Sequence, residues 1–216
     1  MQIIYQDKRI LIAVKPAGVA SVDEPGGMPS LLREYLGDPK ACVRTVHRLD
    51  QAVSGLMVFA RSRAAAAILS EQIRSGKFHK TYLAVTHGVP EQPEGEMRDL
   101  LLYSRSERRS QVVMERGKDV QEALLNYRCI SANEAGSLLR ICLKTGRTHQ
   151  IRVQLSSRGI PIFGDRKYGV ADTAEKIALW SYKLEFCHPE TDELVTFKQL
   201  PPDIFPWNQF SYSALG

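Results

Sequence analysis

Asp50 is the residue of this sequence whose surroundings most favour chemistry. It follows His47 and Arg48, and apolar residues are frequent in the segments on either side, 43–46 and 56–60. A charge left unpaired in an apolar environment is costly, so a carboxylate placed there needs a partner or a function. An ionised carboxylate can act as a nucleophile or as a base without any cofactor. Asp50 is therefore the first candidate for a catalytic group.

A second polar segment, 144–152, supplies a candidate partner. Arg147 follows a Thr-Gly pair between a predicted strand and a predicted helix, where exposed backbone N–H groups favour anions. A guanidinium is always charged and can form two parallel hydrogen bonds to a carboxylate. A nearby arginine also lowers the pKa of an aspartate by about 1–3 units. A structural role for Asp50 stays open as an alternative. In an isolated Arg-x-Asp sequence such as Arg48-Leu49-Asp50, the aspartate more often only caps a turn or pairs with the arginine.

Short strands with few helices among them must position these residues. This mixture favours an α+β fold with a mixed, largely antiparallel sheet and flanking helices. Asn133–Gly136 is a predicted hairpin turn, and Ser54–Gly55 a predicted tight turn after Asp50. The predicted strands cover residues 10–14, 56–61, 81–87, 112–114, 123–130, 138–143, 180–186 and 194–197.

Serine and threonine residues mark the starts of the predicted helices. Ser30, Ser62 and Thr148 each precede a segment with apolar residues at helical spacing. Each can cap the first turn through its side-chain oxygen, and a glycine follows each segment, as is common after a helix.

Composition indicates a globular chain with a mild positive charge. The 216 residues are 44% apolar and 25% charged, and 29 basic against 24 acidic residues give a net charge of +5. The charge fits a nucleic-acid partner without establishing one. No repeat divides the chain, and the loose segment 89–95 lies between strands, so a single domain over residues 1–216 is expected.

The sequence further indicates a cytoplasmic protein without a metal centre. The N-terminus lacks the pattern of a signal peptide, and no apolar run reaches the about 20 residues that cross a bilayer. The four cysteines form no Cys-x-x-Cys pair, which favours small buried thiols in a reducing compartment over zinc ligands. His47 and His149 have no third ligand at a suitable spacing.

The segments 46–55 and 144–152 together resemble the two signature motifs of the RluA-type family of RNA pseudouridine synthases. Segments 15–18, 163–169 and 184–189 match other family segments, and the resemblance runs from about Ile3 to Pro201. It implies the pseudouridine synthase catalytic fold with a central active-site cleft. No accessory N-terminal RNA-binding domain is expected.

The resemblance also implies a role for each matching residue. Asp50 corresponds to the essential catalytic aspartate, and Arg147 to the arginine that forms a salt bridge with it. Tyr82 and Ile151 correspond to the residues that contact the target uracil. Arg48 would hold the RNA while the base leaves the stack, a step that costs a few kcal/mol.

The function implied is the isomerisation of uridine to pseudouridine in structured RNA, either ribosomal or transfer RNA. The reaction needs no cofactor and no metal, and RNA is the expected partner, with no membrane and no obligate protein partner. Val53 and Trp180 depart from the usual family residues, which affects substrate choice more than activity. Two alternatives remain: an inactive RNA-binding module on the same fold, and a metal-dependent nuclease that uses Asp50 with His47.

A cluster of basic residues has no assigned role. A solvated surface is the more common explanation for such a cluster, although its members can also contact phosphates. The cluster consists of Arg105, Arg108, Arg109, Arg116 and Lys118.

Overall fold

The computed structural model describes residues 1–215, and the chain divides into two compact units. Unit 1 comprises residues 1–80 and 180–201, and unit 2 comprises residues 81–179 and those from Pro202 onward. Each unit is a region in which residues contact one another more than they contact the rest of the chain. That residues 1–216 act as one catalytic domain therefore stays a prediction.

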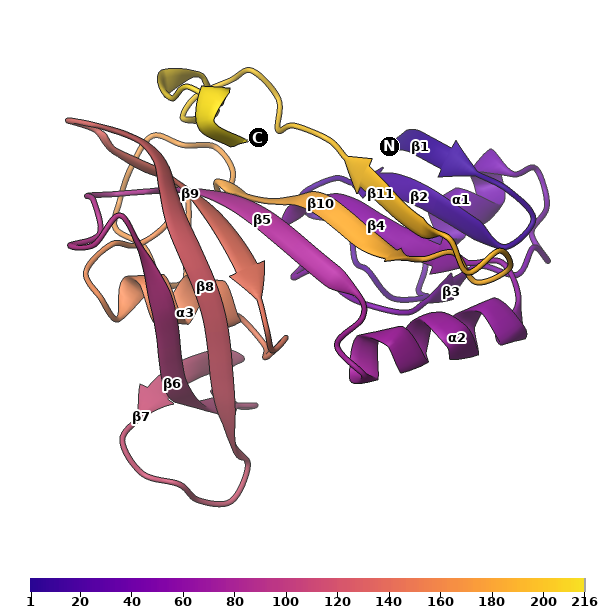
Figure 1. Ribbon diagram of the computed structural model, residues 1–216, viewed down its shortest axis with the longest axis horizontal. Helices are drawn as coiled ribbons and strands as arrows, with labels where there is room; N and C mark the ends of the chain where they lie inside the picture. Colours follow the sequence, from indigo (N-terminus) through magenta and orange to yellow (C-terminus); the bar gives the residue numbers. More distant parts are fainter. Residues whose placement is uncertain (216) are drawn as a thin grey trace. The chain divides into compact units, whose positions relative to one another are not determined.

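Unit 1 is a mixed sheet with two helices (Figure 1). Its strand order is β1–β2–β4–β10, with β3 paired to β4 and β11 paired to β10. Every pair is antiparallel except β4 with β10, which is parallel. The elements are β1 (Gln2–Gln6), β2 (Ile10–Lys15), α1 (Met28–Tyr35), β3 (Arg44–Thr45), β4 (Ser54–Ala60), α2 (Arg63–Arg74), β10 (Leu179–Cys187) and β11 (Leu194–Lys198).

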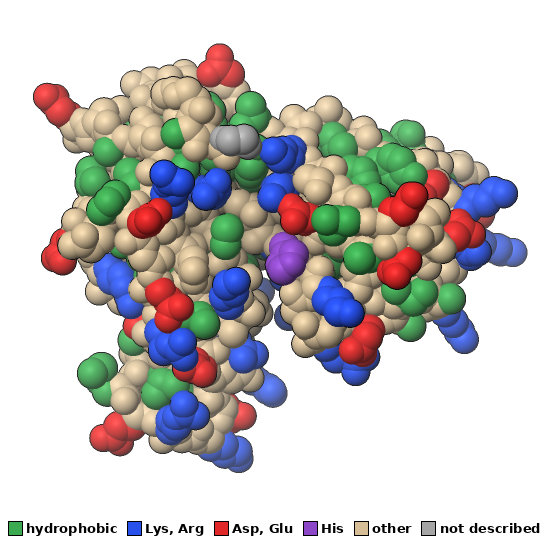
Figure 2. Space-filling model, in the orientation of Figure 1, with side chains coloured by type: hydrophobic (Ala, Val, Ile, Leu, Met, Phe, Trp, Pro, Cys, Tyr) green, Lys and Arg blue, Asp and Glu red, His purple; other side chains and the backbone are tan. Residues whose placement is uncertain are grey.

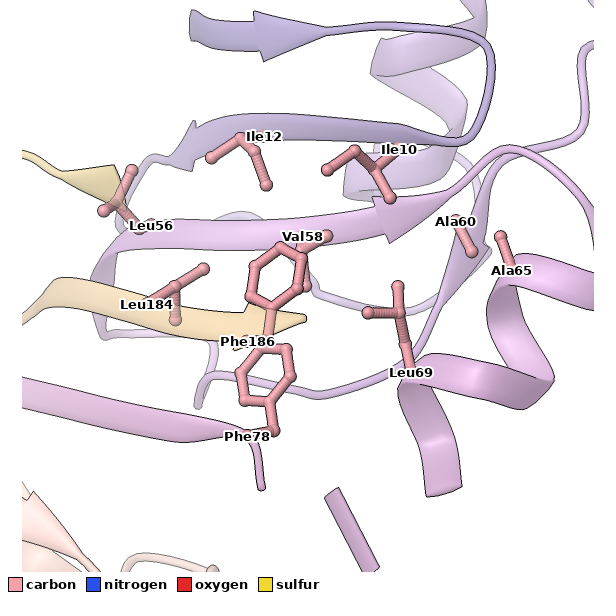
Figure 3. Close-up of a cluster of buried hydrophobic side chains, with 10 residues drawn as sticks. All are labelled: Ile10, Ile12, Leu56, Val58, Ala60, Ala65, Leu69, Phe78, Leu184 and Phe186. Atoms are coloured by element: carbon pink, nitrogen blue, oxygen red, sulfur yellow. The ribbon is translucent and has the colours of Figure 1, made fainter. Parts of the chain in front are cut away.

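The core of unit 1 lies where α2 packs on this sheet (Figure 3). Ile10 and Ile12 are two residues apart in β2, so both point to the same face. Leu69 of α2 and Phe186 of β10 belong to the same cluster, and both are fully buried. Burying one such side chain contributes about 1.5–3 kcal/mol, so this cluster fixes β4, the strand that follows Asp50.

The helix starts are predicted with mixed success. Ser62 caps α2 as expected, because its hydroxyl accepts a hydrogen bond from the Ala65 N–H at 3.1 Å. The prediction for Ser30 is wrong: α1 begins at Met28 with Gly27 as the N-cap. Pro29 explains the earlier start, since a proline in the first turn removes an N–H that has no helical partner.

Unit 2 contains an antiparallel sheet in the order β5–β9–β8–β6–β7, together with helix α3 (Figure 1). The Asn133–Gly136 hairpin turn is confirmed, because these two residues are register partners. The elements are β5 (His79–Thr86), β6 (Glu94–Ser104), β7 (Arg109–Val113), β8 (Val120–Asn133), β9 (Gly136–Leu143), α3 (Gln150–Ser156) and the short 3₁₀ helices Trp207–Gln209 and Ser213–Leu215.

The α+β class with a mixed, largely antiparallel sheet is confirmed, but three strands were not predicted. The missing strands are β1, β3 and β6, and β6 begins inside the loose segment 89–95 that was expected to lie between strands. The cysteines also differ from expectation. Cys42 is exposed and the other three are half-buried, although all four thiols are free.

Candidate active site

Asp50 lies in a loop of unit 1 that leaves β3 and enters β4. Burial alternates along this loop: His47 and Leu49 are buried, Arg48 is exposed and Asp50 is half-buried. The backbone bends at residues 46–47, and the Val53 N–H donates to the Asp50 carbonyl oxygen at 3.0 Å, which closes a turn. Arg48 is thus the exposed side chain of this loop, and Asp50 is partly accessible.

Lys15 anchors the loop just after Asp50. Its ammonium donates to the carbonyl oxygens of Gln51 at 2.9 Å, Val19 at 2.7 Å and Pro16 at 3.0 Å. The Gly18 N–H also donates to the Gln51 carbonyl, at 2.8 Å. An ammonium has three donors, and here each finds an acceptor, so the backbone after Asp50 is tightly fixed.

The electrostatics of Lys15 link it to Asp50. The side chain is fully buried, and the burial lowers the pKa of Lys15 to about 8. The charge of Asp50 acts in the opposite direction and raises this pKa. Segment 15–18 has only a family match in the sequence; the structure adds a buried cation that interacts with the candidate catalytic carboxylate.

Gly55 does not form the tight turn expected after Asp50, and this prediction is wrong. Ser54 and Gly55 are the first residues of β4, paired with Trp180 and Ser181 of the parallel strand β10. A Cβ on Gly55 would lie 2.4 Å from the Ser181 nitrogen. The glycine is there because the β10 backbone comes close, and its φ of +118° disfavours other residues.

Tyr82 and Ile151, the predicted uracil contacts, both belong to unit 2. Tyr82 lies in β5 opposite Ile141 of β9, and Ile151 lies in the first turn of α3. Each side chain is only 5% exposed. The predicted N-cap of this helix, Thr148, is wrong, because His149 occupies that position in a left-handed conformation with φ of 55°.

Arg147 lies in the loop before α3 and is exposed. Its Nε donates to the Glu122 carbonyl oxygen at 2.9 Å, and its own N–H donates to the Gln150 side chain at 3.0 Å. The side chain therefore rests on the end of β8. The predicted salt bridge between Arg147 and Asp50 stays a prediction.

Arg152 is a second arginine of the same segment, and its importance was missed. It is 6% exposed, and its Nε and Nη2 donate to the two carboxylate oxygens of Asp165 at 2.8 and 2.7 Å. Burial alone would raise the pKa of Asp165, but the hydrogen bonds and charge of Arg152 hold it below the usual value. Asp165 lies in segment 163–169, which matches the family without a role. The signal available in the sequence was an acidic residue close behind the apolar segment 160–163.

The histidines do not form a metal site within the described residues. His47 is buried and His149 contacts the Tyr168 hydroxyl through Nδ1 at 2.8 Å. Residues 1–215 contain no group of three His, Cys, Asp or Glu side chains arranged to hold a metal ion. None of the helices in this range is long and apolar enough to span a membrane.

Comparison with known proteins identifies the class of enzyme. Residues 9–157 match the family model described as RNA pseudouridylate synthase. The fold is also that of human RNA pseudouridylate synthase domain containing 1, with a TM-score of 0.79 at 23% identity over 94% of this chain and 84% of that one. The protein is thus an isomerase of RNA.

Two relatives define the branch more closely. The dual-specificity RNA pseudouridine synthase RluA of Vibrio cholerae is 35% identical over 95% of this chain and 84% of its own. The uncharacterized RNA pseudouridine synthase YhcT of Bacillus subtilis is 36% identical over 90% of this chain and 67% of its own. The chain belongs to the RluA-type family of RNA pseudouridine synthases.

Proposed function

We propose that this protein isomerises specific uridines in structured ribosomal or transfer RNA, with Asp50 as the essential catalytic residue, and that it acts in the cytoplasm. The observation that carries the proposal is the Asp50 loop. Its backbone is fixed by Lys15, while Asp50 itself stays half-buried. Preorganisation of this kind is what a catalytic carboxylate requires.

Asp50 has three chemical routes open to it. Its carboxylate can attack the sugar, deprotonate the sugar, or add to the base. In each case the glycosidic C–N bond breaks, the uracil rotates and a C–C bond forms at C5. The C5 proton leaves and N1 takes up a proton, so no atom or electron is gained or lost overall. Tyr82 and Ile151 would hold the uracil, and Arg48, which is exposed beside Asp50, would contact the RNA strand.

Arg147 is the proposed cation beside Asp50, as predicted from the sequence, and its exposure makes it equally suited to a phosphate contact. Arg152 of the same segment is buried, and its Nε and Nη2 are already held by Asp165. Arg147→Lys tests the proposed role, because a lysine keeps the charge but loses the planar fork. If Arg147 is the partner of Asp50, the replacement lowers kcat with RNA affinity retained, whereas a loss of affinity with kcat unchanged would make it a phosphate contact.

Asp50→Asn tests the function itself. The substitution keeps the size of the side chain and removes its charge, so we expect no pseudouridine formation while the fold and RNA binding persist. Asp192→Asn is the matched control, since Asp192 is exposed in the turn between β10 and β11 and asparagine tolerates its φ of 57°. Substantial turnover by Asp50→Asn would contradict the assignment.

Two further measurements exclude the alternatives. The inactive RNA-binding module predicts RNA affinity without any pseudouridine product from the wild-type protein. A metal-dependent nuclease predicts inhibition by EDTA, whereas we expect activity to survive the chelator.

The contact with RNA should be largely electrostatic. On the face drawn in Figure 2, Lys and Arg side chains are interspersed with Asp and Glu and form no single continuous patch. Affinity should then come from separate phosphate contacts, and log affinity should fall with log salt by about 0.7–0.9 per contact. A flat salt response would mean that the partner is not a polyanion.

A further inference from the structure

The backbone before Asp50 is held by a serine from a distant part of the sequence. The Ser21 hydroxyl donates to the Leu49 carbonyl oxygen at 2.7 Å and accepts from the Leu49 N–H at 3.0 Å. A hydroxyl has one donor and two acceptor sites, so it can form both bonds at once. Ser21 is 5% exposed, and Thr45 donates to its carbonyl oxygen at 2.9 Å. One buried side chain thus satisfies both backbone groups of the residue next to Asp50.

His47 provides a second anchor on the same side. Its Nε2 accepts a hydrogen bond from the Val58 N–H at 3.1 Å. The register of β3 with β4, in which Thr45 lies opposite Phe59, would next place Val46 opposite Val58. The imidazole therefore takes the place of a backbone acceptor at the point where the chain after β3 separates from β4.

The protonation state of His47 suits this bond. Burial lowers the pKa of His47 to about 3, and the charge of Lys80 adds to the effect. The ring consequently stays neutral at physiological pH, with Nε2 as the acceptor and the proton on Nδ1. Phe78 packs against the ring at 5.6 Å between centroids, which holds its orientation.

We propose that Ser21 and His47 are positioning residues that fix the backbone on the N-terminal side of Asp50 and thereby aim its carboxylate. The proposal rests on the proposed function, because it assigns a purpose to the orientation of Asp50. Lys15 holds the other side, so both neighbours of the catalytic residue are fixed by buried polar side chains.

Ser21→Ala tests the first anchor. Since a small misplacement of a reacting group can cost about 100-fold in rate, we expect kcat to fall by roughly 10- to 100-fold while KM and RNA affinity are retained. Ser137→Ala is the matched control, because Ser137 is fully buried in unit 2 and its hydroxyl also forms two hydrogen bonds, to Thr86 at 2.7 Å and to the Gly88 carbonyl oxygen at 3.0 Å. That variant should lose stability and keep kcat.

Unchanged kcat in Ser21→Ala, or an equal loss in Ser137→Ala, would overturn the role of Ser21. If the alanine variant does not fold, Ser21→Cys gives the same test, because a thiol is of similar size and a weaker hydrogen-bonding group. We expect kcat of Ser21→Cys to fall with KM retained, and a kcat equal to that of the wild type would overturn the role.

His47→Gln and His47→Phe test the second anchor. Glutamine can place an acceptor near the Val58 N–H, whereas phenylalanine keeps a ring and removes the acceptor. We expect His47→Gln to retain more of kcat than His47→Phe at a temperature where circular dichroism shows both to be folded. Equal values would overturn the role of the hydrogen bond.

The same assay separates this proposal from the proposed function. Absence of pseudouridine formation by the wild type, or activity in Asp50→Asn, defeats the function. An active wild type, an inactive Asp50→Asn and a normal Ser21→Ala defeat only the positioning role.

Discussion

Asp165→Asn removes the carboxylate that pairs with Arg152 and leaves the arginine charge buried. The two side chains are 1% and 7% exposed, and they form two hydrogen bonds. The Asp165 Oδ1 also accepts from the backbone N–H groups of Lys167 and Tyr168, at 3.0 and 3.1 Å. Breaking a buried pair by removing one partner costs about 3–5 kcal/mol. That loss is a large part of the about 5–15 kcal/mol that stabilises a typical protein.

Urea unfolding at pH 7 measures the effect. We expect the free energy of unfolding to fall by about 3–5 kcal/mol in Asp165→Asn. Glu122→Gln is the control, because its pair with Arg98 is exposed and screened by water, so its loss should leave stability nearly unchanged. A loss in Asp165→Asn no larger than in Glu122→Gln would refute the reasoning.

The pH dependence gives an independent check. The folded-state pKa of Asp165 lies below its usual value, so the unfolded state takes up a proton first as pH falls. The stabilisation is therefore complete above the unfolded pKa of about 3.9 and is lost as pH falls through the lower folded pKa. The difference between wild type and Asp165→Asn should shrink below about pH 4. A difference that grows with acid would show that the carboxylate is not the stabilising form.

Three further predictions concern the site. The folded-state pKa of Lys15 is lowered to about 8, whereas the unfolded lysine has a pKa of about 10.4. Between about pH 8 and about pH 10.4 the unfolded state therefore binds more protons, and the free energy of unfolding should rise with pH by up to about 3 kcal/mol. A Lys15→Met variant measured by urea unfolding should lack this rise. Gly55→Ala should fail to give folded protein by circular dichroism, since its Cβ would lie 2.4 Å from backbone, whereas Gly76→Ala meets open space and should fold. Tyr82→Ala should weaken RNA binding by up to about 1–3 kcal/mol, whereas Tyr82→Phe should bind normally and turn over slowly; equal rates for Tyr82→Phe and wild type would remove the hydroxyl from the proton transfer.

Local patterns predicted the elements in which one residue type has one strong structural meaning. Ser62 lies directly before an alanine-rich segment, and no competing cap is nearby, so α2 was predicted correctly. The Asn133–Gly136 turn was found because Asn and Gly favour tight hairpins; the Asn133 side chain accepts from the Ala135 N–H at 2.9 Å.

The failures came from residues whose surroundings are distant in sequence. β6 has several charged residues among its first members and a mostly exposed pattern there, so it resembles a linker until β8 pairs with it. Gly55 was interpreted as a turn because glycine is common in turns, but the cause is the close approach of β10, more than 120 residues later in the chain. No local window contains that contact.

The candidate site divides in the same way. Asp50 could be found from its neighbours in sequence. The groups that hold its loop are distant, because Ser21 bonds to Leu49 across 28 positions and Lys15 bonds to Gln51 across 36. A serine that forms two buried hydrogen bonds looks the same in sequence as one on the surface, so only the fold distinguishes them.

The arginines of segment 144–152 show the same limit of local sequence patterns. Arg147 and Arg152 lie five residues apart in one motif, and a charge beside a Thr-Gly turn made Arg147 the natural choice. Burial separates them, since Arg147 is exposed and Arg152 is 6% exposed and fixed by Asp165. The planar fork of Arg152 is engaged by a buried carboxylate, so it stabilises unit 2. Arg152→Lys should therefore lower the free energy of unfolding more than Arg147→Lys does, and the reverse order would show that the buried pair is not a major stabilising contact.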